Sequence, residues 1–310
     1  MTKGGNAGAN EPEQIRKQTW AGQSFNDILR GKVAVVTGAA RGIGRSIAVD
    51  FAANGADVIG IDICREVSPI LEFQAATPEQ LDQTGEIVKS NGRRWLGIKA
   101  DIRKIDELRT AAERIASEFG GIDIVVANAG IQNFKPLLEM EDAHWHDVID
   151  TNLNGTANTV RAFAPHLVKR GGGRLILISS MQGRYGTKNG ASYSASKWGI
   201  IGLMKSAALE LGKHKITVNT IEPGLIDTPL TRNDKRWSMA AGETMTAPPP
   251  EHPSEEETVK ARLPKVPLGV PWLTPEQVAP VAVFLASDAA AMVTGACYDV
   301  TGGDSAHNTA

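Results

Sequence analysis

The sequence predicts an α/β protein built on one doubly wound parallel sheet of about seven strands, with helices on both faces. From Gly31 onward, short apolar runs alternate with longer helical stretches, an order typical of strands joined by right-handed helical crossovers. The short runs are apolar throughout instead of alternating with polar residues, which indicates a sheet covered on both faces. No internal repeat and no second apolar core is evident. Residues 30–310 are therefore expected to form a single domain, preceded by a flexible polar tail at 1–29.

The individual elements follow from this rhythm. The expected strands are 32–38, 57–63, 94–101, 123–130, 174–180, 215–224 and 297–303. The expected helices cover about 43–54, 79–91, 104–119, 141–170, 192–213 and 275–286.

Two long connections interrupt the rhythm, at 64–79 and at 225–271. Connections of this length in a compact domain are usually functional or disordered. The second follows a strand end, where ligands bind in such sheets. It is expected to form a lid over an apolar pocket without a regular helix, and its proline- and glutamate-rich tract at 247–257 is expected to be a solvated tip. The large apolar groups that suggest a lid, each of which could instead merely pack the connection down, are Trp237, Met239, Met245 and Trp272.

The composition limits the classes of function. The formal net charge is −2 and no Lys/Arg-rich run occurs, so a nucleic-acid partner is not expected. The two cysteines, Cys64 and Cys297, have no Cys or His partner at metal-ligand spacing. They predict neither a metal site nor a disulfide framework, and they fit a reducing, cytoplasmic compartment. No apolar run approaches the roughly 20 residues that span a bilayer, so no membrane association is expected.

A glycine-rich turn, TGAARGIG at 37–44, follows the first strand and opens a helix. Gly38 permits a tight turn, while Gly42 and Gly44 allow backbone and helix to come close to a pyrophosphate. The helix N-terminus offers unpaired N–H groups and the positive end of its dipole to the phosphates. Arg41 could add positive charge there, or it could simply be exposed.

Acidic and small residues at the next strand ends complete a dinucleotide site. Asp62 ends the second strand, where a carboxylate binds the ribose 2′-hydroxyl of NAD and would repel the 2′-phosphate of NADP. NAD is therefore favoured over NADP, although Arg65 lies close in the sequence. Asp101 could accept a hydrogen bond from the adenine amino group, and the small residues at 128–130 let a cofactor lie close. For each of the last two positions a structural turn is an alternative.

The stretch YSASK at 193–197 places Tyr193 and Lys197 one helical turn apart, on one face. A free tyrosine has a pKa near 10, and a nearby ammonium is expected to lower it. Such a phenol can serve as a general acid/base for alcohol oxidation. Ser180, at the end of a strand, could orient the same substrate oxygen, whereas Ser179 points to the opposite side. Asn152, a residue that helices disfavour, could hold a water that links the lysine to solvent.

In their order and spacing these motifs resemble the short-chain dehydrogenase/reductase family, over about residues 30–305. The resemblance implies a Rossmann-type sheet, Tyr193 as acid/base, Lys197 lowering its pKa and binding the nicotinamide ribose, Ser180 orienting substrate, and Asn152 supporting a proton relay. It also implies a homotetramer. The residues then expected to bind NAD are Gly38, Arg41, Gly42, Ile43, Gly44, Asp62, Ile63, Asp101, Ile102, Asn128, Ala129, Gly130, Tyr193, Lys197, Pro223, Gly224, Ile226 and Thr228.

A narrower resemblance concerns the long connections. The stretches VIGIDIC (58–64), ATPEQL (76–81) and VPWLTPEQV (270–278) are similar to the carveol-dehydrogenase-like subgroup, many members of which are associated with mycofactocin and hold NAD tightly. That subgroup usually reads RGQGRSH where this chain has RGIGRSI (41–47), the pattern of the wider family. Coupling to mycofactocin and a terpenoid substrate therefore stay open.

The expected activity is NAD-dependent interconversion of a secondary alcohol and a ketone, with a cyclic or hydrophobic substrate. A sugar or polyol substrate is the alternative, and a non-enzymatic NAD sensor is disfavoured because the tyrosine and lysine are both present. Arg184 or Gln182 would favour a polar or anionic substrate, and Trp237 or Met239 a terpene-like one. The substrate-contacting residues suggested by position are Gln182, Tyr185, Asn189 and Trp237.

Overall fold

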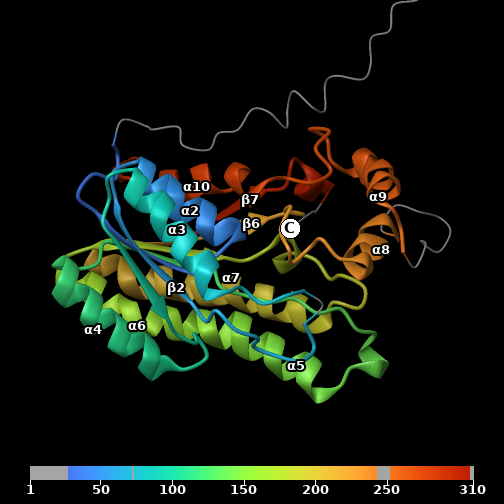
Figure 1. Cartoon of the computed structure of the whole chain (residues 1–310), viewed down its shortest axis with the longest axis horizontal. Coiled ribbons are helices and arrows are strands. Elements are labelled where there is room, and N and C mark those ends of the chain that lie inside the picture. Colours follow the sequence, from blue (N-terminus) through green and yellow to red (C-terminus); the bar gives the residue numbers. More distant parts are fainter. Residues whose placement is uncertain (1–26, 72, 243–251, 308–310) are drawn as a thin grey trace, which may run out of the picture.

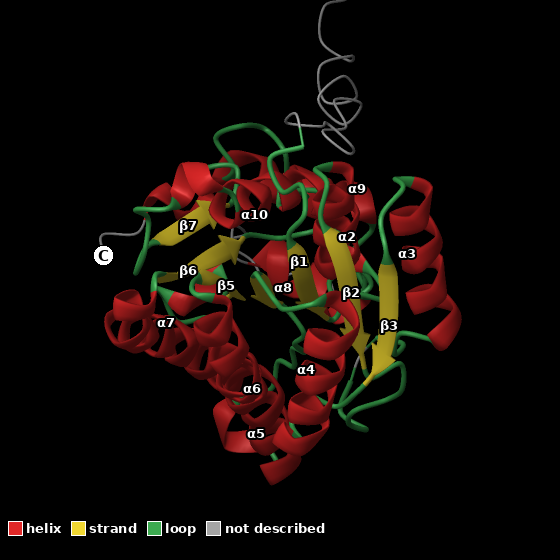
Figure 2. Ribbon diagram, turned by 90° about the vertical axis from the view of Figure 1, so that its left-hand side faces the viewer, coloured by secondary structure: helices red, strands yellow, loops and turns green. Residues whose placement is uncertain are grey.

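A computed structural model describes residues 27–71, 73–242 and 252–307. Its centre is one seven-stranded parallel sheet with the order β3-β2-β1-β4-β5-β6-β7 (Figure 2). The strands are β1 (Val33–Thr37), β2 (Asp57–Asp62), β3 (Trp95–Lys99), β4 (Ile124–Ala127), β5 (Gly173–Ile178), β6 (Ile216–Pro223) and β7 (Cys297–Val300). The strand order reverses between β1 and β4, and ligands of such sheets bind at the carboxyl ends of the strands beside this point.

Helices cover both faces of the sheet (Figure 1). On one face lie α2 (Gly42–Ala53), α3 (Pro78–Ser90) and α10 (Ala279–Ala286). On the other lie α4 (Ile105–Phe119), α6 (Gly155–Arg170) and α7 (Ala191–Leu211). Each face has its own apolar core, because both sides of the buried strands carry apolar side chains. The fold class predicted from the sequence is confirmed, and each strand begins within one residue of its predicted start.

The first core also contains Leu29, which precedes the expected start of the domain by one residue. Its side chain is fully buried, and its backbone N–H donates to Asn54 O at 2.9 Å. The remainder of the predicted tail, apart from residues 27 and 28, lies outside the described residues.

The predicted helix 141–170 is interrupted by a turn of π-helix. The chain forms α5 (Asp142–Ile149), a π-helical segment (Asp150–Asn154) and then α6 without leaving the helical region. A π turn accommodates one extra residue and is frequently found at functional sites. Here it contains Asn152, one of the expected catalytic residues.

The expectation of a connection without helices after β6 is wrong. Two helices form there, α8 (Asp234–Gly242) and α9 (Glu255–Arg262), at one end of the sheet in Figure 1. Ser254 caps α9, because its side chain accepts from the Glu257 backbone N–H while Glu257 reaches back to the Ser254 backbone. The described end of the proline- and glutamate-rich tract therefore starts a helix, and Ser254 and the three glutamates that follow it are exposed, as expected. Met245 and residues 247–251 lie outside the described residues.

Candidate active site

A cavity of about 240 Å³ opens at the carboxyl ends of the strands and is covered by the two long connections. Its lining includes every residue expected to contact NAD except Gly44, and it also includes Ser180 of the expected catalytic residues. The cavity thus brings together motifs that are spread over 190 residues between Gly38 and Thr228. Asn152 does not line it but lies directly behind its wall.

The glycines of the first turn are required by close backbone packing. Gly38 has φ +69°, and a Cβ there would lie 2.8 Å from Asn128 Nδ2. Gly44 lies behind the turn, where a Cβ would come within 2.1 Å of Gly38 O. Asn128 explains this crowding, because its Nδ2 donates to Thr37 O at 2.8 Å and thereby joins β4 to the turn. Gly44 therefore shapes the site without facing the cavity.

The Asp62 carboxylate is fixed by backbone donors on both sides. The Ala40 N–H donates to Oδ2 at 3.1 Å, and the Cys64 N–H donates to Oδ1 at 3.0 Å. Asp62 is buried at the end of β2 and lines the cavity. Arg41 is close enough to interact electrostatically with this carboxylate. These hydrogen bonds fix the position of the Asp62 carboxylate relative to the glycine turn.

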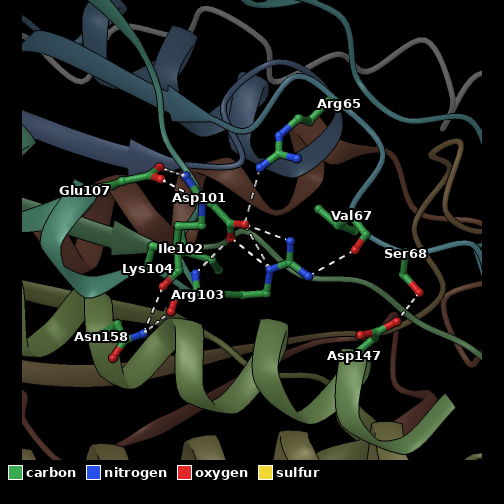
Figure 3. A network of polar contacts seen from close by, with 10 residues as sticks. All are labelled: Arg65, Val67, Ser68, Asp101, Ile102, Arg103, Lys104, Glu107, Asp147 and Asn158. Atoms are coloured by element: carbon green, nitrogen blue, oxygen red, sulfur yellow. Dashed lines mark hydrogen bonds and ion pairs between the residues drawn. The ribbon is translucent and has the colours of Figure 1, made fainter. Parts of the chain in front are cut away.

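Asp101 has partners that the sequence did not reveal (Figure 3). Arg103 grips its carboxylate, with an Nη2–Oδ2 distance of 2.7 Å, and Arg65 Nη2 lies 3.8 Å away. Burial alone would raise the pKa of Asp101, but hydrogen bonds from the Arg103 side chain and backbone hold that pKa below its ordinary value. The expected hydrogen bond from an adenine amino group to Asp101 would have to share the carboxylate with this ion pair.

The same network holds the connection between β2 and α3. Arg103 Nη1 donates to Val67 O at 3.0 Å, and the Ser68 hydroxyl donates to Asp147 of α5 (Figure 3). Further along, Asn133 Nδ2 donates to Ile70 O at 2.9 Å. Side chains of the connection, among them Val67, Leu71 and Phe73, also line the cavity. This segment was predicted only as a long connection, and the structure makes it one wall of the site.

Tyr193, Ser180 and Lys197 line the same cavity. The Ser180 side chain is near enough to the Tyr193 phenol to act on its pKa, and its Oγ accepts from the Gln182 N–H at 3.2 Å. Lys197 is buried, its Nζ lies 5.5 Å from the centre of the Tyr193 ring, and it donates to Ile178 O at 3.0 Å. Ser179 instead donates to Lys197 O at 2.9 Å. Of the two serines, Ser180 is therefore the one beside the phenol.

The pKa of Tyr193 departs from the expected direction. Burial raises it, and this effect outweighs the hydrogen bond from Ser180 and the positive charge of Arg236, which both lower it. Burial also lowers the pKa of Lys197 to about 8. The expectation that Lys197 leaves the phenol more acidic than a free tyrosine is wrong for this geometry, because the four-residue spacing carried no information about desolvation.

The Asn152 side chain is hydrogen-bonded to the main chain that follows β4. Its Oδ1 accepts from the Ile131 N–H at 2.8 Å, and its Nδ2 donates to Ile131 O at 2.9 Å and to Ser196 Oγ at 3.1 Å. The π turn aims this side chain inward, where it is fully buried. All three contacts are with protein groups, so the proton relay implied by the family resemblance stays a prediction.

The expected substrate residues separate into two groups. Gln182 lines the cavity, whereas Tyr185, Asn189 and Trp237 are not among its lining residues in the described part of the chain. Trp237 packs edge-on against Trp272 at 6.2 Å, so these two residues hold the connection together. Arg184 forms an ion pair with the buried Glu222 of β6 and likewise does not line the cavity.

Two residues near the phenol were missed. Phe134 lies with its ring centre 6.0 Å from that of Tyr193, and the guanidinium carbon of Arg236 lies 5.4 Å from the centre of the Phe134 ring. Arg236 lines the cavity from α8. The capping pattern at 254–257 was a signal for α9, but no local pattern indicated that α8 would turn an arginine toward the site.

Among the described residues, no group of three or more His, Cys, Asp and Glu side chains could hold a metal ion. No helix within the described ranges combines the length and apolar character needed to cross a membrane.

The cavity lies at the carboxyl ends of the strands, beside the point where their order reverses, which is where doubly wound sheets bind dinucleotides. Comparison with known proteins agrees with a dinucleotide-binding class: residues 32–239 match the short chain dehydrogenase family, and the chain belongs to that family.

Individual relatives span almost the whole chain. A short-chain type dehydrogenase/reductase of Mycolicibacterium smegmatis is 41% identical over 278 residues, covering 89% of this chain and 97% of that protein. The (-)-trans-carveol dehydrogenase of Rhodococcus erythropolis is 37% identical over 277 residues, covering 89% and 98%. A crystal structure of carveol dehydrogenase from Mycobacterium avium in complex with NAD has a TM-score of 0.83 at 37% identity, covering 89% of this chain and 98% of that one. The resemblance to carveol dehydrogenases inferred from the sequence is thus confirmed.

Proposed function

We propose that the protein is an NAD-dependent dehydrogenase that interconverts a secondary alcohol and its ketone, with a cyclic, largely apolar substrate. The observation that carries the proposal is that Tyr193 and Ser180 line the same cavity, near enough for Ser180 to act on the pKa of the phenol, while the other half of the cavity has the features of a dinucleotide site. A phenol and a hydroxyl that converge on one point can hold and protonate the oxygen of a carbonyl substrate.

The described residues fit NAD. The turn at Gly38 and Gly42 leaves room for a pyrophosphate, because both glycines have positive φ and no side chain. Asp62 presents a carboxylate to the ribose end, which favours a free 2′-hydroxyl over a 2′-phosphate. The NAD complex of the Mycobacterium avium relative supports the same choice. When bound, the nicotinamide accepts or returns the hydride.

The residues of the chain supply the proton chemistry. In the oxidising direction, Ser180 orients the substrate hydroxyl and the phenolate of Tyr193 takes its proton. In the reducing direction, the phenol returns a proton to the carbonyl oxygen. Lys197, buried and hydrogen-bonded to Ile178 O, supplies positive charge behind the ring when protonated. The walls exclude water from the reacting groups, since the Tyr193 ring is buried by Ile131 and by the β2–α3 connection.

The apolar character of the substrate is inferred from the lining near Tyr193 and from the carveol dehydrogenase relatives. The lining contributed by the segments after β4, β5 and β6 includes the apolar residues Ile131, Met181, Leu225, Pro229 and Leu230. Gln132 and Gln182 are polar lining residues on the same side. A sugar or polyol is therefore the second candidate, and Gln182 favours it, because its buried Oε1 has no hydrogen-bond partner among the described residues.

Other features expected from the family belong to the same proposal. We infer a homotetramer in the cytoplasm, a single domain over residues 30–310, and a lid at about 225–271. The ion pairs of Arg232 with Asp227 and Glu255 support the lid, because they tie the end of β6 to α9.

The test is the appearance of NADH at 340 nm with NAD⁺ and a panel of secondary alcohols: cyclic terpenols, simple cycloalkanols, sugars and polyols. We expect turnover with the cyclic alcohols and at least tenfold lower kcat/KM with NADP⁺. Turnover confined to sugars would replace the first candidate by the second. No turnover with any of these classes, although NAD binds, would contradict the proposal as stated.

A further inference from the structure

The Gln182 side chain has a hydrogen-bonding atom that the fold itself does not use. Gln182 lines the cavity and is only 5% exposed. Its Oε1 is buried and has no hydrogen-bond partner among the residues that the structure describes. A buried acceptor without a partner loses its hydration and gains nothing in return, so such atoms are rare in native proteins. The amide oxygen of Gln182 is therefore a candidate to bind a ligand that enters the cavity.

The main chain that carries Gln182 is fixed on both sides. Gln182 lies in a short helical turn after β5, in which the Gly183 N–H donates to Ser180 O at 2.8 Å. Directly beyond this turn, Arg184 forms an ion pair with the fully buried Glu222 of β6. The position from which the Gln182 side chain starts is thus set by the sheet and does not depend on the lid.

The same turn places Gln182 close to the serine that is expected to orient the substrate. Ser180 Oγ accepts from the Gln182 N–H at 3.2 Å, so the two side chains start from neighbouring points of the cavity wall. Ser180 in turn is near enough to Tyr193 to act on the pKa of the phenol. The groups that Ser180 and Gln182 bind should therefore lie close together on one ligand.

The ligand group that best fits this amide is a hydroxyl. An amide oxygen accepts and an amide NH₂ donates, and a hydroxyl can do both, so it fits either end of the side chain. A carboxylate offers only acceptors and an ammonium only donors. The other glutamine of the lining, Gln132, already uses its amide within the protein, because its Nε2 donates to Leu230 O at 2.5 Å.

We propose that Gln182 recognises a second hydroxyl of the substrate, on a ring carbon one or two positions away from the reacting carbon. The proposal rests on the proposed function and deepens it: the substrate is a cyclic alcohol with an apolar skeleton and a second hydroxyl, or the matching hydroxyketone. Ser180 and Tyr193 receive the reacting oxygen, Gln182 receives the second hydroxyl, and the apolar lining receives the skeleton. One cavity then has a use for both its apolar lining and its unpaired amide oxygen.

Binding to the full chain saturated with NADH tests the proposal without turnover, because a reduced cofactor cannot oxidise an alcohol. The probes are 1,2-, 1,3- and 1,4-cyclohexanediol, cyclohexanol, and the fluorocyclohexanols that carry fluorine in place of the second hydroxyl. Calorimetry measures each Kd. We expect the 1,2- or the 1,3-diol to bind about tenfold more tightly than cyclohexanol and the matching fluorocyclohexanol. Equal binding of all probes, binding of none, or a preference for the 1,4-diol alone overturns the proposal.

Matched variants separate recognition by Gln182 from the general polarity of the cavity. Gln182→Met has a similar length without the amide and should remove the preference for the diol. Gln182→Glu keeps an acceptor oxygen and should keep the preference. Gln132→Met removes the other glutamine of the lining and should also keep it. If Gln182→Met retains the preference, or if Gln132→Met removes it as completely, the proposal fails. NADH binding, read by energy transfer from tryptophan, checks that each variant is folded.

Kinetics distinguish this inference from the proposed function and from an effect on Ser180. With NAD⁺, Gln182→Met should raise KM about tenfold for the preferred diol and leave KM for cyclohexanol nearly unchanged. A substitution that acts through Ser180 would instead lower kcat equally for both alcohols, which contradicts the inference. Equal kcat/KM for cyclohexanol and every diol overturns the inference and leaves the proposed function standing. Diol binding that depends on Gln182, without turnover of any alcohol, refutes the proposed function and leaves the role of Gln182 standing.

Discussion

The two halves of the cavity are built in different ways. The half that we propose binds NAD, the cofactor half, consists of strand ends and the turns that follow them, and Asp62 in it is held by backbone hydrogen bonds from Ala40 and Cys64. The substrate half is assembled from side chains that meet only in the folded chain, such as Phe134, Tyr193 and Arg236. The first half has a fixed shape that local sequence dictates. The second depends on burial and on connections that can vary without disturbing the sheet.

The largest effect is expected from removing the phenol of Tyr193 from the substrate half of the cavity. Tyr193→Phe should lower kcat by about 10³-fold, because the acid/base group is lost. NAD affinity should stay nearly unchanged, since the cofactor half keeps its contacts. Initial rates and NADH fluorescence titration measure the two quantities. Tyr298→Phe on β7 is the matched control and should keep the wild-type rate. A Tyr193→Phe enzyme with most of its rate would refute the acid/base assignment.

The corresponding change in the cofactor half is Gly44→Ala. A Cβ at Gly44 would lie 2.1 Å from Gly38 O and 2.6 Å from Asn128 Nδ2, so the turn and the end of β4 must separate. We expect a loss of about 1–3 kcal/mol in the free energy of unfolding, as for other overpacked positions, together with weaker NAD binding. Urea denaturation measures the first effect.

A glycine elsewhere provides the control for Gly44→Ala. Gly202 lies in α7, and a Cβ there would meet nothing within 4 Å. Gly202→Ala should therefore stabilise the protein by about 0.5–1 kcal/mol, the helix-propensity difference between the two residues. If Gly44→Ala and Gly202→Ala change the free energy of unfolding equally, close packing behind the turn is not the reason for a glycine at position 44.

A smaller effect is expected from the charge of Asp62. Asp62→Asn keeps the shape but removes the carboxylate, so kcat/KM for NAD⁺ should fall by about tenfold to a hundredfold, the value of one charged hydrogen bond. Relative activity with NADP⁺ should rise, because repulsion of the 2′-phosphate is relieved and Arg41 is close by. Asp82→Asn, at an exposed position of α3, should leave the NAD/NADP ratio unchanged. An unaltered ratio in Asp62→Asn would show that another group sets cofactor choice.

The mildest perturbation is a change of pH. Burial raises the pKa of Tyr193, so the phenolate needed to oxidise an alcohol is scarce at neutral pH. Below that pKa, kcat/KM for oxidation should rise about tenfold per pH unit, as the phenolate fraction does. Reduction uses the protonated phenol and should not rise. Initial rates in both directions from pH 6 to 10 measure this, and a flat oxidation profile would contradict a titrating tyrosine with a raised pKa.

The difference between the two halves of the cavity also explains which features could be predicted from the sequence. The glycine turn, Asp62 and the Tyr193–Lys197 pair were recognisable because each is local and occupies a fixed place relative to a strand or helix. The parallel sheet itself followed from the alternation of short apolar runs with helical stretches. In all these cases a few neighbouring residues determine the structure.

The substrate half was less predictable for physical reasons. The direction of the Tyr193 pKa depends on burial by Ile131 and by the β2–α3 connection, more than 60 residues away in the chain. The partners of Asp101 depend on Arg103 folding back and on Arg65 approaching from another connection. The position of Arg236 depends on α8, for which the local sequence gave no clear indication. Desolvation and long-range contacts have no periodicity that a sequence pattern can show.

The π turn at Asp150–Asn154 also affects which mutations the protein can tolerate. One added residue rotates the side chains before it by about 100° about the helix axis relative to the side chains after it. The corresponding faces of α5 and α6 therefore point in different directions, although the two helices are continuous. As a result α5 can face α7 while α6 faces α4. Mutations that change the packing of α5 beside Tyr193 therefore need not turn α6 out of the core. A single-residue deletion within the π turn would remove this rotation. Either α5 would then lose its contact with α7, or α6 would lose its contact with α4.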